Sequence, residues 1–270
     1  MSETTYTHGT SAEMLGVMSG RRVAEWLPFL VPHLKPGFNM ADCGCGPGSL
    51  TVDLADLVKP GKVVGIDIHT GQFAEGRRMA AGRRLTNVEF RQGNLTQLPF
   101  ESGSLDAVIA VTAIQHLRNP VDGLNEIRRV LKPGGIVAVK DEDWGSLLWE
   151  PRTPPLRKFA ELITKVWEHN GGRPFYPRRL RSCLLEAGFA RAEASAVARA
   201  FGTPAQTRWL CEHFLRGHLI EPNFVETAVG QGWTDRLELE AIRAETEAWA
   251  DRPDAFWSLT FCEALGWVGK

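Results

Sequence analysis

Short, almost wholly apolar runs alternate with helix-like stretches between residues 38 and 140. Residues 63–66 (VVGI) and 107–111 (AVIAV) contain no polar side chain, which is what strands buried on both faces require. Strands of this kind that alternate with helices are typical of βαβ units and a parallel sheet. The pattern predicts strands over residues 38–43, 62–68, 88–92, 105–111 and 136–140, and helices over residues 49–57, 70–84 and 121–130.

The flanking segments are expected to add helices and closing strands to a single α/β domain over residues 1–270. Residues 12–34 are amphipathic, residues 151–187 hold two helical patterns around a Gly-Gly-Arg-Pro break, and residues 204–250 are almost wholly helical. The alternation of Trp257, Leu259 and Phe261 predicts a late strand. We expect a helical lid over residues 1–35, a core over 36–143, helical cap inserts over 144–187 and 204–250, and closing strands over 188–201 and 255–268.

The charge balance and the distribution of apolar residues argue against several kinds of partner. The chain has 31 basic and 32 acidic residues, a formal net charge of −1, and so offers no net positive field to nucleic acid or to an anionic membrane. No apolar run reaches the ~20 residues that span a bilayer, and the polar N-terminus lacks the apolar core of a signal peptide. Five cysteines in apolar segments fit reduced thiols. The expectation is a cytoplasmic protein with no nucleic-acid, membrane or metal partner.

Residues 42–49 (DCGCGPGS) take the end of the first predicted strand through a glycine-rich turn into a helix. Glycines allow a sharp turn and admit a ligand against the main chain, and the helix N-terminus offers free N–H groups. Asp67 ends the next predicted strand, where a carboxylate can accept hydrogen bonds from both hydroxyls of a ribose. These two features suit NAD and S-adenosylmethionine equally. Asp42 favours S-adenosylmethionine, because a carboxylate repels a pyrophosphate and attracts an ammonium and a sulfonium.

Five motifs, in order along the chain, resemble those of class I S-adenosylmethionine-dependent methyltransferases, in particular the type 11 group similar to the ubiquinone and menaquinone biosynthesis enzymes. They are Asp42-x-Gly44-x-Gly46-Pro47-Gly48, residues 64–67 (VGID), residues 93–100 (GNLTQLPF), residues 105–108 (LDAV) with 114–117 (IQHL), and residues 129–135 (RVLKPGG). The resemblance implies a Rossmann-like, seven-stranded, mostly parallel sheet with helices on both faces. It also implies methyl transfer to a small molecule.

The resemblance further implies a cofactor site. Its members are Tyr6, Arg21, Asp42, Gly44, Gly46, Gly48, Asp67, Ile68, Asn94, Leu95, Ala110 and Gln115. Asn94 stands where the family usually has Asp, so the bond to the adenine amino group would come from a neutral carbonyl. Residues 6–9 and Arg21 are similar to an actinobacterial branch in which Tyr6 packs on the cofactor and Arg21 pairs with its carboxylate, a geometry that suits a bidentate guanidinium. The alternative is that Tyr6 is disordered and that Arg21 is a solvated helix charge.

Candidate groups for the chemistry follow two predicted strands. Methyl transfer from a sulfonium disperses charge, so alignment of the nucleophile and exclusion of water matter most. A hydroxyl or acidic carbon acceptor also needs a base. Asp141 and Asp143 after the fifth strand, and His116 after the fourth, are the candidates for base or substrate positioning, and each has an alternative structural role in capping, ion pairing or hydrogen bonding. Arg173, Tyr176 and Arg178 are candidates to line the substrate pocket.

Tryptophans outside the core strands favour an apolar or aromatic acceptor. They are Trp144, Trp149, Trp167, Trp209, Trp233 and Trp249. The alternative is that they only form the core of the cap. A role in secondary metabolism is a further expectation. Two alternatives stay open, an NAD-dependent oxidoreductase and a protein that binds S-adenosylmethionine without methyl transfer, as a regulator or a cyclase. The sequence does not identify the acceptor or the methylated atom. The helical segments and the N-terminal arm could mediate a homodimer.

Overall fold

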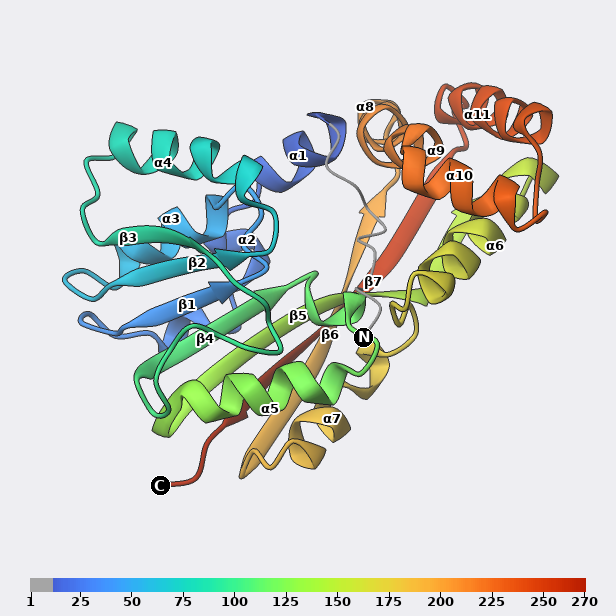
Figure 1. The fold of residues 1–270 in the computed structure, drawn as a ribbon. Coiled ribbons are helices and arrows are strands. Elements are labelled where there is room, and N and C mark those ends of the chain that lie inside the picture. The colour runs from blue at the N-terminus through green and yellow to red at the C-terminus, as the bar shows by residue number, and fades with distance from the viewer. Residues whose placement is uncertain (1–11) are drawn as a thin grey trace. The chain divides into compact units, whose positions relative to one another are not determined.

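Seven strands form one sheet in the computed structural model, which describes residues 12–270 (Figure 1). Their order is β3-β2-β1-β4-β5-β7-β6, and the β1–β2, β1–β4, β2–β3 and β4–β5 pairs are parallel. The predicted seven-stranded, mostly parallel sheet is therefore confirmed. The strands are β1 (Met40–Cys43), β2 (Val63–Asp67), β3 (Val88–Gln92), β4 (Leu105–Val111), β5 (Leu131–Glu150), β6 (Arg191–Phe201) and β7 (Phe256–Trp267).

The helices of the core follow the predicted pattern, and short helices lie near the N-terminus. The amphipathic segment over residues 12–34 is broken into two short helices and a 3-10 turn, because Gly20 and Pro28 do not continue a helix. The helices are α1 (Ala12–Ser19), α2 (Val23–Trp26), α3 (Ser49–Leu57), α4 (Phe73–Gly82), α5 (Pro120–Val130), α6 (Pro154–His169), α7 (Leu180–Glu186), α8 (Pro204–Leu210), α9 (Arg216–Ile220), α10 (Pro222–Gly230) and α11 (Arg236–Ala250).

The chain divides into two compact units. The glycine-turn unit comprises residues 18–141, 176–196 and 262–270. The helical unit comprises residues 142–175 and 197–261, with the described residues up to Val17. Strands β5, β6 and β7 have residues in both units.

In the glycine-turn unit, helices cover both faces of the sheet. Helices α3 and α4 lie on one face, and α5 and α7 lie on the other (Figure 1). Leu124 and Ile127 of α5 and Leu184 of α7 share one buried cluster with Ala41 of β1 and Val108 of β4. The near-continuous apolar runs of the strands are explained by this double coverage.

The ring of Phe90 on β3 sets how closely α3 and α4 approach the sheet. A Cβ atom at Gly48, Gly65 or Gly76 would lie 2.4, 2.8 or 2.3 Å from a carbon of this ring. Gly48 precedes α3, Gly65 lies in β2 and Gly76 lies in α4. Any larger side chain at these three positions would displace the ring, so the glycines allow the close packing of two helices on two strands.

The helical unit has an aromatic core. Trp167, Trp249, Trp257, Phe159 and Phe224 are among its fully buried side chains. Of the tryptophans singled out from the sequence, Trp144, Trp167 and Trp249 are buried in this core, while Trp149, Trp209 and Trp233 keep part of their surface exposed. At least half of this set therefore contributes to the packing of the unit.

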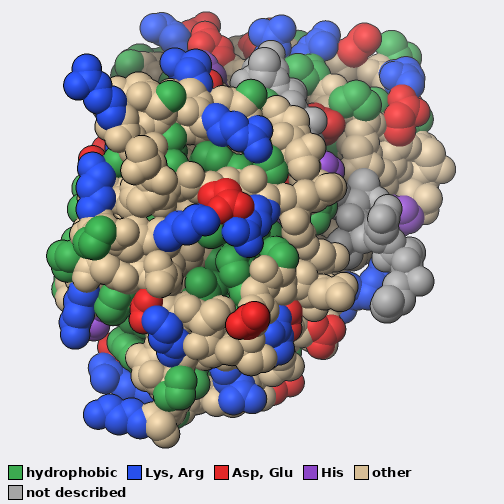
Figure 2. Space-filling model, turned by 60° about the vertical axis from the view of Figure 1, so that its left-hand side comes forward, with side chains coloured by type: hydrophobic (Ala, Val, Ile, Leu, Met, Phe, Trp, Pro, Cys, Tyr) green, Lys and Arg blue, Asp and Glu red, His purple; other side chains and the backbone are tan. Residues whose placement is uncertain are grey.

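The surface carries charges of both signs. On the face drawn in Figure 2, Lys and Arg side chains are dispersed, and several lie beside Asp or Glu side chains. Ion pairs within one helix, such as Arg78–Glu75 and Arg129–Glu126, contribute to this mixture. Across residues 12–270, no helix combines the length and the apolar character needed to cross a membrane.

A buried ion pair joins β5 to β7 within the glycine-turn unit. Lys140 Nζ lies 2.6 Å from Glu263 Oε1, and each side chain is only 4% exposed. Lys140 Nζ also donates to the carbonyl of Trp26 (3.0 Å), and Ser195 Oγ donates to Glu263 Oε2 (3.0 Å). The charges are thus matched by a counter-ion and by further hydrogen bonds, which a buried pair needs.

Replacement of one member of this pair should destabilise the fold strongly. Glu263→Gln is expected to lower the free energy of unfolding by about 3 kcal/mol, because Lys140 stays buried without its counter-ion. Denaturant titration measures the loss. The double variant Lys140→Met with Glu263→Leu should recover most of it, since no buried charge remains. A Glu263→Gln variant as stable as the wild type would contradict this account.

Candidate cofactor site

The turn between β1 and α3 depends on glycines in the left-handed backbone region. Gly44, Gly46 and Gly48 have φ angles of +77°, +53° and +83°, which L-residues rarely adopt. The N–H groups of Gly44 and Cys45 both donate to the carbonyl of Ile66 on β2, at 2.7 and 3.0 Å. The turn therefore passes close to the end of β2, just before α3, whose first N–H groups have no partners within the helix.

Asp67, at the end of β2, is hydrogen-bonded to this turn. Its Oδ2 accepts from the N–H of Gly46, and its Oδ1 accepts from the N–H of His69, both at 2.9 Å. Each carboxylate oxygen can accept a further hydrogen bond. Ile68, which follows it, is 48% exposed. Asp67 is thus positioned by the backbone and keeps acceptor capacity for the two hydroxyls of a ribose.

Asp42, at the end of β1, is a buried acid. Its side chain is 2% exposed and accepts a 2.6 Å hydrogen bond from Thr51 Oγ1 of α3. The pKa of Asp42 is raised to about 7, chiefly by burial; the Thr51 bond lowers it, the nearby charge of Asp67 raises it and the charge of Arg21 lowers it. A cation bound beside Asp42 would favour its ionised form.

Arg21 contacts the loop that follows β4. Its Nη1 donates to Thr112 Oγ1 at 2.9 Å, and its guanidinium lies 4.2 Å from the centroid of the Trp26 ring. Thr112 has a φ angle of +51°, a rare conformation for a β-branched residue. The next N–H, that of Ala113, donates to Asp141 Oδ1 at 3.0 Å. The strained loop is therefore held from two sides. Tyr6, predicted beside Arg21, lies outside the described residues.

The remaining predicted cofactor residues differ in accessibility. Asn94 is exposed, and its Oδ1 accepts hydrogen bonds from the N–H and the hydroxyl of Thr96, both at 2.9 Å. An adenine amino group would have to share this oxygen. Leu95 is half-buried, and the side chains of Ala110 and Gln115 are fully buried.

Two of the candidate catalytic residues, Asp141 and Asp143, accept hydrogen bonds from backbone N–H groups. Besides holding Ala113, the buried carboxylate of Asp141 faces the Tyr176 hydroxyl, whose pKa is raised by burial and by the charge of Asp141. Asp143, in the helical unit, accepts from the N–H of Gly145 at 3.1 Å. His116 is half-buried in a 3-10 turn after β4. Arg173 and Arg178 are exposed, whereas Tyr176 is buried.

Gln72, which was not predicted, also faces the glycine turn. It ends the 3-10 turn Thr70–Gln72 between β2 and α4 and is 8% exposed. Its Oε1 is buried without a hydrogen-bond partner, and a Cβ atom on Gly46 would lie 3.2 Å from it. No sequence pattern marks this residue, because a glutamine in the first turn of a predicted helix is ordinary.

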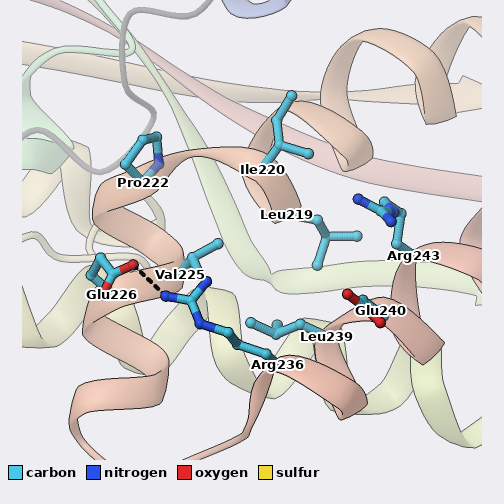
Figure 3. A pocket seen from close by; sticks show the side chains of 9 residues that line it. All are labelled: Leu219, Ile220, Pro222, Val225, Glu226, Arg236, Leu239, Glu240 and Arg243. Carbon is cyan, nitrogen blue, oxygen red and sulfur yellow. Dashed lines mark hydrogen bonds and ion pairs between the residues drawn. The ribbon is translucent and has the colours of Figure 1, made fainter.

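A separate pocket of about 380 Å³ lies within the helical unit. Figure 3 shows the Arg236–Glu226 ion pair (2.8 Å) along one side of it. The pocket is lined by Leu219, Ile220, Pro222, Val225, Glu226, Arg236, Leu239, Glu240 and Arg243. None of the predicted cofactor or catalytic residues within residues 12–270 lines it, and its two arginines are balanced by two glutamates.

Comparison with known proteins identifies the family. A family model described as a methyltransferase domain matches residues 41–139. A demethylmenaquinone methyltransferase from Lactococcus lactis is 39% identical over 188 residues, which cover 63% of this chain and 75% of that protein. The chain belongs to the family of S-adenosylmethionine-dependent methyltransferases. The matched region of the methyltransferase runs from β1 into β5 and includes the glycine turn, Asp67 and Thr112.

Other relatives extend the match over the rest of the methyltransferase. A probable methyltransferase from Aspergillus luteorubrus is 25% identical over 284 residues, covering 97% of this chain and 96% of that protein. A transposon protein of Streptomyces fradiae is 31% identical, but the match spans only 58% of its length. The crystal structure of a Bacillus halodurans protein has a TM-score of 0.62 at 19% identity and covers 92% of this chain and 99% of that one. This last likeness supports the fold alone.

The raised pKa of Asp42 predicts how cofactor binding to the methyltransferase depends on pH. Since a cationic ligand favours the ionised acid, the affinity for S-adenosylmethionine should be about tenfold lower at pH 6 than at pH 8, on either side of the pKa of about 7. Calorimetry at the two pH values measures the ratio.

The Asp42→Asn variant is the control for this measurement, and its affinity should not change with pH through this group. The stability of the fold depends on pH with the opposite sign. Between pH 4 and pH 7 the folded protein holds a proton on Asp42 that the unfolded chain has lost, so this group's contribution to stability falls as the pH rises. A wild-type affinity equal at pH 6 and pH 8 would contradict the role given to Asp42.

Proposed function

We propose that this methyltransferase binds S-adenosylmethionine at the turn between β1 and α3 and transfers its methyl group to a small apolar or aromatic acceptor. The observation that carries the proposal is the hydrogen bond from the N–H of Gly46 to Asp67. It places a carboxylate with spare acceptor capacity directly beside a glycine turn at a helix N-terminus, where an adenosine with a charged tail can bind.

The residues around the turn fit this cofactor. Gly44 leaves no room for a side chain, since a Cβ atom there would lie 2.6 Å from Ala113 Cβ, so the main chain itself can contact the ligand. We assign Asp67 to the ribose and Asp42 to the ammonium and sulfonium charges. Arg21 is assigned to the cofactor carboxylate, which would require its guanidinium to bind the ligand in addition to Thr112.

Asp42 disfavours a dinucleotide. It lies in β1 just before the glycine turn, and an anionic pyrophosphate would meet its negative charge. The sulfonium of S-adenosylmethionine supplies an activated methyl group and a positive charge. Asp42 therefore favours the methyl donor over NAD, whereas Asp67 suits the ribose of either ligand.

For the acceptor, the support is indirect. The Lactococcus relative is named for demethylmenaquinone, and the helical unit of this chain is rich in aromatic side chains. We propose an apolar or aromatic acceptor on these grounds, with His116, Asp141 or Asp143 as the group that positions it or takes its proton. The predicted cytoplasmic location, homodimer and role in secondary metabolism stay predictions.

Calorimetry with S-adenosylmethionine, S-adenosylhomocysteine and NAD tests the cofactor assignment. The first two should bind with micromolar affinity, and Asp67→Ala should weaken their binding about 10- to 100-fold, as expected when hydrogen bonding of the ribose to a charged group is lost. Asp56→Ala is the matched control, because Asp56 is an exposed acid that contacts Lys59, and it should bind like the wild type. Binding of NAD in place of both sulfur compounds would overturn the proposal.

Turnover separates methyl transfer from binding alone. Incubation with S-adenosylmethionine and a panel of phenols, hydroquinones and aromatic amines should release S-adenosylhomocysteine and one acceptor heavier by a methyl group. Conversion of an acceptor with the cofactor left intact would instead support the non-methylating role.

A further inference from the structure

The buried side-chain oxygen of Gln72 is directed at the cofactor turn. Within the described residues 12–270, Gln72 Oε1 has no hydrogen-bond partner, and it lies 3.2 Å from the position of a Cβ atom on Gly46. We propose that this oxygen accepts a hydrogen bond from one hydroxyl of the cofactor ribose, so that Gln72 and Asp67 recognise the ribose together. The inference rests on the proposed function, since it names a second residue of the same site.

In the part of the chain that the structure describes, no donor near Gly46 satisfies this oxygen. The N–H of Gly46 already donates to Asp67, and Met18 Sδ, 3.3 Å from the same Cβ position, carries no hydrogen to donate. A buried carbonyl without a donor costs free energy, and folded proteins seldom leave one. A ligand hydroxyl at the turn would remove that cost.

The ordinary structural role for Gln72 does not apply. It occupies the position before α4, where polar side chains commonly accept a hydrogen bond from the first turn of the helix. Its side chain makes no such bond. Gln72 is therefore polar, buried and unused by the helix that it precedes.

The ribose is the part of the cofactor best placed to supply the donor. Asp67 and Gln72 lie on the same connection between β2 and α4, and both approach Gly46. Each oxygen of Asp67 already accepts one backbone N–H, so a neighbouring acceptor relieves the competition for two hydroxyls. An amide provides it without a third negative charge beside Asp42 and Asp67.

Gln72→Met tests the proposal, because methionine keeps the length of the side chain and removes the carbonyl. The ligands are S-adenosylhomocysteine and its 2′-deoxy and 3′-deoxy forms, measured by calorimetry. The variant should bind S-adenosylhomocysteine about five- to tenfold more weakly than the wild type. It should bind one of the two deoxy ligands as well as the wild type does, since that ligand lacks the hydroxyl in question.

Two controls exclude damage to the fold. Gln231→Met changes an exposed glutamine of the helical unit and should leave all affinities unchanged. In the absence of ligand, Gln72→Met should unfold at the same temperature as the wild type or a higher one, because it removes an unsatisfied buried carbonyl. A structural role would lower that temperature.

The outcomes separate this inference from the proposed function. Wild-type affinity in the Gln72→Met variant overturns the inference, as does an equal loss for the parent and both deoxy ligands, which would place the donor on the ammonium or the adenine. If the wild-type protein binds neither S-adenosylmethionine nor S-adenosylhomocysteine, the proposed function fails and the inference with it.

Discussion

The packing of one ring, that of Phe90, against three glycines is the constraint on which the glycine turn between β1 and α3 depends. Because Gly48 touches this ring and also precedes α3, the start of the helix is fixed by β3, two strands away in the sheet. Gly65 and Gly76 bring β2 and α4 to the same ring. The direction of the free N–H groups at the start of α3 is therefore set by core packing and does not depend on the loop alone.

Contacts from three strand ends then define the turn itself. The carbonyl of Ile66 and the carboxylate of Asp67 hold it from β2, and Ala113 packs against Gly44 from the loop after β4. That loop is in turn held by Asp141 of β5. The carboxyl ends of parallel strands lie at one edge of the sheet. Residues as far apart in the sequence as Asp42 and Asp141 therefore contribute to the same turn and to the loop that supports it.

The sequence could predict the parts of this arrangement that have a local cause. Strands buried on both faces must be apolar throughout, and this revealed β1 to β4 to within about two residues. The extent of β5 was missed, since it continues to Glu150 through the buried acids 141–143, which no hydrophobic pattern marks as strand.

The chemistry of the site depends on the tertiary structure and could be predicted only in outline. The positions of Asp42 and Asp67 after their strands follow from sequence, but the pKa of Asp42 comes from its complete burial. The left-handed Thr112 and the unsatisfied oxygen of Gln72 have no sequence signature. All three raise the free energy of the ligand-free fold, as an acid kept from ionising, a strained backbone and an unpaired carbonyl.

These three unfavourable features, the buried acid, the left-handed residue and the unpaired carbonyl, lie around one turn. Their common location is evidence about the function of that turn. A turn that served only to connect β1 to α3 would gain nothing from them, and apolar or more flexible residues would remove each one. A cationic ligand with a ribose would return the charge to Asp42 and supply a donor to Gln72. In natural proteins, unfavourable local features of this kind occur more often at functional sites than elsewhere. Here one ligand, a cation with a ribose, would account for both the buried acid Asp42 and the unpaired oxygen of Gln72.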